Sequence, residues 1–225
     1  MSRAFCIPGI LFLLCAFVLN FLVSISLPYL TALDIARTHF GDGAIQQTNV
    51  QGIAEIRFGI WAPCYYNTND DRTCLRTGHG YSVEIANTRQ TEAITVKSSW
   101  TRGLAVHPVA AAATFVALLL SFSTHVTVTL LASLVSFLAA LITLIAFAID
   151  IALYALVRHE MKKLEIGANT NTAPGFWMTL VALVLLLLAG CTVCFGRRRD
   201  RLSGATTTST HTKPSFLDRF RRTKA

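Results

Sequence analysis

The chain has 225 residues, of which 53% are hydrophobic and only 14% are charged, and its mean hydropathy is +0.52. A soluble domain carries about 25% charged residues. The composition therefore argues against a soluble globular protein and favours a membrane protein. The net charge is +8, and the segment 197–225 alone contributes +7, from nine basic and two acidic residues.

Four apolar windows follow one another along the chain, at about 5–30, 104–123, 126–157 and 176–195. Each is long enough to cross about 30 Å of hydrocarbon, which takes about 20 apolar residues. In lipid the backbone must satisfy its own hydrogen bonds, so each window is predicted to be a membrane helix. The length and low charge of these windows argue against the alternative that they are buried helices of a soluble protein. The first window has too long an apolar core for a typical signal peptide and lacks a clear cleavage site, which favours a retained helix.

The basic residues after the fourth window set the expected orientation. Arg197, Arg198, Arg199 and Arg201 adjoin this window, and such clusters belong on the cytoplasmic side. With four crossings, both termini are then cytoplasmic, and the loops 31–103 and 158–175 lie outside. Three basic residues in the second outer loop oppose this orientation, but we expect the denser cluster to prevail.

The first outer loop contains the only two cysteines expected outside the membrane, Cys64 and Cys74. The others lie in or beside the apolar windows: Cys6, Cys15, Cys191 and Cys194. Two cysteines that face an oxidising compartment predict a disulfide. A metal site is the alternative, but a second pair of ligands is missing, and His79 alone completes no four-ligand spacing.

The local structure of this outer loop is predicted to be β. Apolar and polar residues alternate loosely in 52–61, 80–88 and 92–100, which is typical of half-buried strands. The segment 67–72, between the cysteines, has the composition of a turn. We therefore expect a small sheet of three or four strands, with Trp61 packed beneath it near the membrane surface.

Asp150 is the one carboxylate inside an apolar window, and intramembrane charges are rare and often functional. The third window is longer than the hydrocarbon requires, which places Asp150 at the outer end of its helix. We expect a structural role there, with Arg102 or another loop donor as its partner. A proton or ion path is the alternative, although the other polar residues of the windows are mainly Ser, Thr and Asn20.

The sequence offers little sign of catalysis. It contains no H-E-x-x-H, no G-x-S-x-G and no phosphate-binding glycine loop, so neither an enzymatic activity nor a cofactor is expected. Histidine titrates near neutral pH, which makes His39, His79 and His107 candidate proton sensors. His107 can equally be an interfacial residue at a helix start.

The inner end of the chain suggests contact with lipids rather than nucleic acid. Cys191 and Cys194 precede the basic cluster and are candidate palmitoylation sites. The cluster is expected to attract anionic lipids. The tail 202–225 is predicted to be disordered, although 215–225 can also form a membrane-surface helix. Many Ala and Ser residues in the second and third windows favour close helix packing, within the bundle or between copies of the chain.

The segment Gly59-Ile60-Trp61, followed by Cys64 and Cys74, resembles the signature of the claudin-like tetraspans. Further segments resemble the fungal PalI-type (eisosome-tetraspan and PalI) proteins: "SLPYLTALDIARTHF", "RFGIWAPCYY", "GHGYSV", "SWTRGLAVHPVA" and "AFAIDIALYA". The resemblance extends to about Arg201, which suggests a membrane domain at 1–201 and a basic tail at 202–225. It implies a four-helix bundle with a small extracellular sheet.

The resemblance also implies a function. A PalI-type protein is expected to be a non-enzymatic plasma-membrane protein that assists ambient-pH signalling by supporting or localising a membrane sensor. The alternative is a structural organiser of cortical membrane domains at eisosomes, growing tips or division sites; a channel or transporter ranks behind both. No tryptophan precedes Trp61, so the sealing role of claudins does not follow. The tail is also too short to carry over the interactions of long-tailed relatives.

Overall fold

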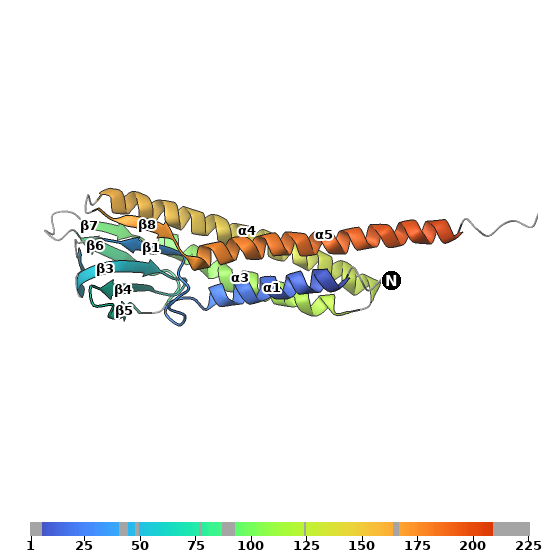
Figure 1. Ribbon diagram of the computed structural model, residues 1–225, viewed down its shortest axis with the longest axis horizontal. Helices are drawn as coiled ribbons and strands as arrows, with labels where there is room; N and C mark the ends of the chain where they lie inside the picture. Colours follow the sequence, from blue (N-terminus) through green and yellow to red (C-terminus); the bar gives the residue numbers. More distant parts are fainter. Residues whose placement is uncertain are drawn as a thin grey trace, which may run out of the picture.

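The computed structural model describes residues 6–40, 45–47, 50–76, 78–86, 93–123, 125–163 and 167–208. Long helices form a bundle, and strands form a sheet at one end of it (Figure 1). The helical elements are α1 (Cys6–Ser24), α2 (Ser98–Thr101), η2 (Arg102–Ala105), α3 (Val106–Ser121), α4 (Val126–Lys163) and α5 (Pro174–Thr208). The strands are β1 (Ala36–His39), β2 (Ile45–Gln47), β3 (Val50–Phe58), β4 (Pro63–Asn67), β5 (Arg72–Cys74), β6 (Val83–Ala86), β7 (Ala93–Val96) and β8 (Asn169–Thr172).

Three helical segments of the described chain are long and apolar enough to cross a membrane: Ser98–Ser121, Thr127–Lys163 and Pro174–Cys191. A shorter apolar helix, Pro8–Ser24, accompanies them. The first window was predicted to continue to residue 30, but α1 ends at Ser24. The Ser24 hydroxyl donates to the carbonyl oxygen of Phe21 (2.7 Å), and the chain then turns toward the sheet.

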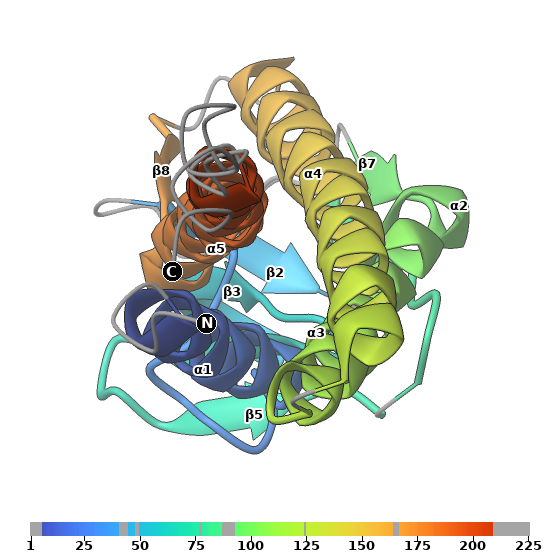
Figure 2. The same cartoon turned by 90° about the vertical axis from the view of Figure 1, so that its right-hand side faces the viewer.

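The four long helices form a ring in which each packs against two neighbours (Figure 2). α1 and α4 lie opposite each other, and both contact α3 and α5. The interior is built largely from small residues, which let the backbones approach closely. Its fully or nearly fully buried members include Ala16, Ala117, Ala139, Ala140 and Ala189.

Helix α4 has 38 residues, which corresponds to about 57 Å, well beyond the hydrocarbon thickness. It ends at Lys163 rather than at the predicted Val157. The extension is stabilised by packing, because Leu153, Val157 and Met161 are buried in the hydrophobic core that α4 shares with the sheet.

The sheet has eight strands instead of the predicted three or four. The main path runs β5-β4-β3-β2-β6-β7, and β1 pairs with both β3 and β8. Strand β8 comes from the second outer loop and runs antiparallel to β1, with Ala36 opposite Thr172. Neither β1 (ARTH) nor β8 (NTNT) has apolar alternation, so the local pattern does not predict a strand there. Their buried Thr38 and Thr170 hydroxyls form a hydrogen bond of 3.0 Å.

Exposed aromatic side chains lie near the ends of the bundle helices that adjoin the sheet. Tyr29 follows α1, Trp100 lies in α2 and Trp177 lies in the first turn of α5, and their exposed fractions are 70%, 45% and 54%. Tyr and Trp are enriched where a membrane meets water. Their exposure here fits a membrane boundary just below the sheet.

Helix α5 continues past the apolar window to Thr208. Residues 202–208, at the start of the tail that was predicted to be disordered, lie in this helix. The remainder of the tail, 209–225, lies outside the described residues.

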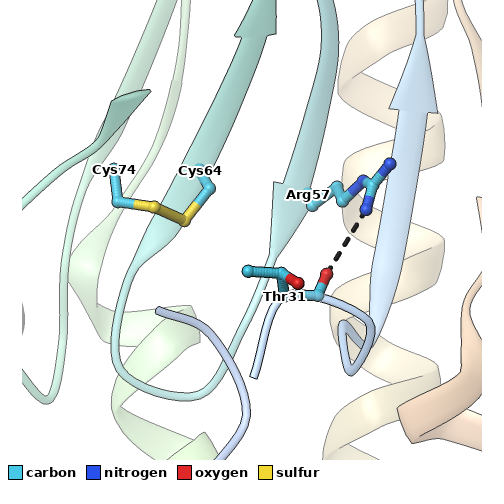
Figure 3. The surroundings of a disulfide bond; sticks show 4 residues. All are labelled: Thr31, Arg57, Cys64 and Cys74. Atoms are coloured by element: carbon cyan, nitrogen blue, oxygen red, sulfur yellow. Dashed lines mark hydrogen bonds between the residues drawn. A yellow bond between two sulfur atoms is a disulfide. The ribbon is translucent and has the colours of Figure 1, made fainter. Parts of the chain in front are cut away.

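The predicted disulfide between Cys64 and Cys74 is present, and it joins directly opposite positions of β4 and β5 (Figure 3). Cys64 is fully buried beneath Leu27 and Tyr66. Closing a loop of this length stabilises by about 3 kcal/mol in the chain-entropy model.

We expect Cys64→Ser to lower the thermal unfolding temperature of the purified protein and to reduce its delivery to the cell surface. Thermal unfolding in detergent and surface labelling measure the two effects. Cys15→Ser is the matched control, because Cys15 is an exposed free cysteine. Unchanged stability of Cys64→Ser would contradict a stabilising role for the disulfide.

Candidate functional site: the outer joint and the buried polar contacts

Gly59 lies where the chain that leaves α1 crosses the sheet. A Cβ atom at this position would lie only 2.4 Å from the Leu27 Cβ and 3.1 Å from the Ala62 carbonyl oxygen. Such contacts are shorter than packed atoms allow, so the glycine is needed for the close approach of the two segments.

Trp61 connects this crossing to the membrane helix. Its indole Nε1–H donates to the Ser24 carbonyl oxygen at the end of α1 (2.7 Å). The neighbouring Ile60 N–H donates to the Ser26 hydroxyl (3.0 Å). The Tyr81 hydroxyl donates to the Gly59 carbonyl oxygen (2.8 Å), and its burial raises the pKa of this phenol well above its ordinary value. These contacts form a joint between α1 and the sheet, which we call the outer joint.

A second contact ties the sheet to α5. Asp34 is fully buried, and its carboxylate accepts two hydrogen bonds from Arg37, at 3.0 and 2.9 Å. The hydrogen bond from Arg37 to Asp34 is the main reason why the pKa of Arg37 rises above its ordinary value. The Asp34 carbonyl oxygen also accepts a hydrogen bond from the Gly175 N–H, in the first turn of α5 (2.9 Å).

The charge cluster continues on the face of β1 and β3 that carries Arg37. Glu55 accepts from Arg57, lies 3.3 Å from the Arg37 Nε and pairs with His39 at 3.2 Å. Arg57 also donates to the Thr31 carbonyl oxygen (Figure 3), and its guanidinium carbon lies 4.1 Å from the centre of the Tyr66 ring. His39 thus has a carboxylate partner, whereas His79 is exposed.

Asp150 pairs with His107, and this corrects the predicted pairing with Arg102. The His107 Nε2 lies 2.9 Å from the Asp150 Oδ1, and both side chains are almost completely buried. Arg102 is exposed and packs instead against Gly80. It lies in the short η2 segment before α3, whereas His107 lies within α3 and faces α4. The pair therefore joins α3 to α4 close to the sheet.

Asn20 makes a second polar contact deeper in the bundle. Its side-chain amide donates to the Thr114 hydroxyl (3.2 Å) and, at 3.5 Å, to the Thr143 hydroxyl. The contact joins α1, α3 and α4, and all three side chains are buried. Interhelical hydrogen bonds of this kind hold helices together in lipid.

The groups singled out from the sequence do not form one site. Gly59, Trp61 and the disulfide gather at the base of the sheet, whereas Asp150 lies inside the bundle. At the end of the bundle away from the sheet, Cys191 is an exposed free cysteine. The side chains of Cys194 and of the basic cluster Arg197, Arg198, Arg199 and Arg201 lie outside the described ones, so lipid contact and palmitoylation there stay predictions.

The described side chains include no group of three or more His, Cys, Asp or Glu that could hold a metal ion. The buried ionisable groups mostly pair with one another. These paired groups are suited to holding the helices and strands in fixed positions relative to one another.

We expect Gly59→Ala to lower the stability of the outer sheet by about 1–3 kcal/mol, the usual cost of overpacking. The added methyl group would collide with Leu27. Gly78→Ala is the matched control, because a Cβ there meets nothing within 4 Å. Thermal unfolding of both variants in detergent provides the comparison, and equal stability would contradict the proposed close contact.

We expect Asp150→Asn to fold and reach the membrane, since the amide oxygen can still accept from His107. Asp150→Leu should be destabilised by about 1–3 kcal/mol, because it leaves the buried His107 side chain without its hydrogen-bond partner. Expression level, gel filtration and thermal unfolding distinguish the two variants. A fully stable Asp150→Leu protein would show that the pair does not support the fold.

Comparison with known proteins agrees with this architecture. No curated protein matches the chain. The model of the SUR7/PalI family matches residues 5–189, which include α1, the whole sheet, α3, α4 and most of the apolar part of α5. This family consists of tetraspan membrane proteins. The outer joint, the disulfide and the buried polar contacts all fall within the matched region, and the chain is a member of the SUR7/PalI family of membrane proteins.

Proposed function

We propose that the chain is a non-enzymatic plasma-membrane protein that assists the response to ambient pH by supporting or localising a membrane sensor. In this proposal α1, α3, α4 and α5 each cross the membrane once. Both termini are cytoplasmic, and the sheet lies outside. Family membership and the apolar helices support a multi-pass membrane protein, and the basic cluster after α5 favours this orientation.

The observation that carries the proposal is the firm attachment of the sheet to the helices. The Trp61 side chain forms a hydrogen bond with the end of α1, and the Asp34 backbone forms one with the start of α5. Val157 of α4 is buried in the hydrophobic core that α4 shares with the sheet. The outer surface is therefore held in one orientation relative to the bundle. A fixed surface is suited to positioning another protein in the same membrane, because little conformational freedom is lost on binding.

A second candidate function is the organisation of cortical membrane domains by lateral association. Ala148, Ala152 and Ala155 are exposed on α4. Small residues on an exposed helix face let a second helix approach closely. This feature favours contacts between copies of the chain or with other membrane proteins.

Growth of a deletion strain at acidic and alkaline pH tests the two candidates. The signalling role predicts failure to grow at alkaline pH, restored by the wild-type chain but not by Gly59→Ala, which disturbs the outer joint. Gly78→Ala should restore growth. Normal growth at alkaline pH, with altered cortical patches, would favour the organising role.

The orientation can be tested independently with a tag at the C-terminus. Protease applied to intact cells should leave this tag untouched, since the Arg197–Arg201 cluster is expected to stay inside. Permeabilised cells provide the control, in which the tag should be removed. Loss of the tag from unbroken cells would overturn the orientation.

A further inference from the structure

Exposed basic residues gather where the sheet meets the helix bundle. Two connections lie at this junction. Residues 75–82 join β5 to β6, and residues 97–105 include α2 and η2 and lead from β7 into α3. They carry Arg76, Lys97 and Arg102, whose side chains are all exposed. We call these three residues the basic patch.

The two connections are held against each other and against the base of the sheet. The Thr101 hydroxyl donates to the Tyr81 carbonyl oxygen (2.7 Å). The Arg102 side chain lies over Gly80, where a Cβ atom would be only 2.5 Å from the Arg102 Cγ. Tyr81 in turn belongs to the outer joint, through its hydrogen bond to the Gly59 carbonyl oxygen (2.8 Å). The segments that carry the basic patch are therefore fixed to the rest of the structure.

The positive charge of the basic patch is not neutralised within the described part of the chain. None of the ion pairs between described residues includes a member of the patch. Asp34 lies at the same junction, but it is fully buried and pairs with Arg37. The exposed Glu84 of β6 lies opposite Thr95 and forms none of these ion pairs. The patch therefore lacks a negatively charged partner among the described residues.

The basic patch lies at the level where the membrane begins. Trp100 lies between Lys97 and Arg102 in the sequence and is 45% exposed, and the apolar helix α3 follows directly. Indole rings favour the headgroup layer, and Lys and Arg side chains near helix ends extend toward this layer. Lipid phosphates are thus the anions that the patch meets first. An acidic soluble protein could reach the junction only by displacing headgroups.

We propose that the basic patch selects anionic phospholipids, which gather on the α2 side of the protein in the leaflet that adjoins the sheet. The guanidinium groups of Arg76 and Arg102 can each donate two parallel hydrogen bonds to a phosphate, and the Lys97 ammonium adds a point charge. A zwitterionic headgroup cancels its own phosphate charge, so the patch favours lipids with a net negative charge. The α5 side has no counterpart, because residues 173–177 are all uncharged. The inference is independent of the proposed role in pH signalling.

Quenching of tryptophan fluorescence by brominated lipids tests the proposal on two sides of the bundle, where Figure 2 shows α2 and α5. Trp177→Phe leaves Trp100 beside the basic patch, and Trp100→Phe leaves Trp177 on the α5 side; Trp61 is common to both proteins. Phosphatidylcholine nanodiscs carry an equal fraction of brominated phosphatidylcholine or brominated phosphatidylglycerol. In the Trp177→Phe protein the anionic lipid should quench more strongly, as expected for a several-fold local enrichment, and high salt should reduce this excess. In the Trp100→Phe protein the two lipids should quench equally.

Removal of charge in the Trp177→Phe protein locates the effect. Lys97→Gln combined with Arg102→Gln should remove most of the excess quenching by the anionic lipid. Lys97→Gln alone, at an exposed side chain, should lower it and serves if gel filtration shows that the double variant misfolds. Lys162→Gln is the matched control, because this exposed residue lies at the far end of α4. Equal quenching by the two lipids, an equal excess in the Trp100→Phe protein, or an excess undiminished by charge removal would overturn the proposal.

Discussion

Lipid tails are as apolar as the side chains of a membrane helix, so helices inside a bilayer gain little from the hydrophobic effect when they associate. The bundle must instead be held by close packing and by polar contacts. Alanines supply the close packing, and Asn20 and the His107–Asp150 pair supply the polar contacts. Because these contacts fix α1, α3 and α4 relative to one another, they also fix the platform on which the outer sheet rests.

The sheet contacts the helix bundle at several places. Gly59 has no side chain, and this allows the Leu27 segment to cross it and the Trp61 indole to reach α1. Asp34 connects β1 to α5 through its backbone and to Arg37 through its side chain. The extended end of α4 covers the inner face of the sheet.

The sequence predicted the features that depend on composition and local pattern. Long apolar windows identified the membrane helices, and two outward cysteines identified the Cys64–Cys74 disulfide. It did not identify β1 and β8, because their pairing depends on a partner more than 130 residues away rather than on local alternation. The partner of Asp150 was missed for a similar reason. His107 was judged from its place at a helix start, whereas the packing of α3 against α4 determines which way it points.

The contacts of isolated Ser and Thr residues in the apolar windows could likewise not be predicted from the local sequence. Read one at a time, they are ordinary helix residues that often bond to their own backbone. Only the packing of α1 against α3 and α4 brings Thr114 and Thr143 to Asn20.

The place of β8 has a consequence for how the protein is made. Strand β1 is synthesised early, but one of its edges pairs with β8, which follows three quarters of the way along the chain. Until β8 emerges, β1 presents an open edge, and open strand edges invite pairing with foreign chains. A nascent chain therefore carries an unfinished sheet through most of its synthesis. Completion of the sheet then coincides with the arrival of the last helix, α5.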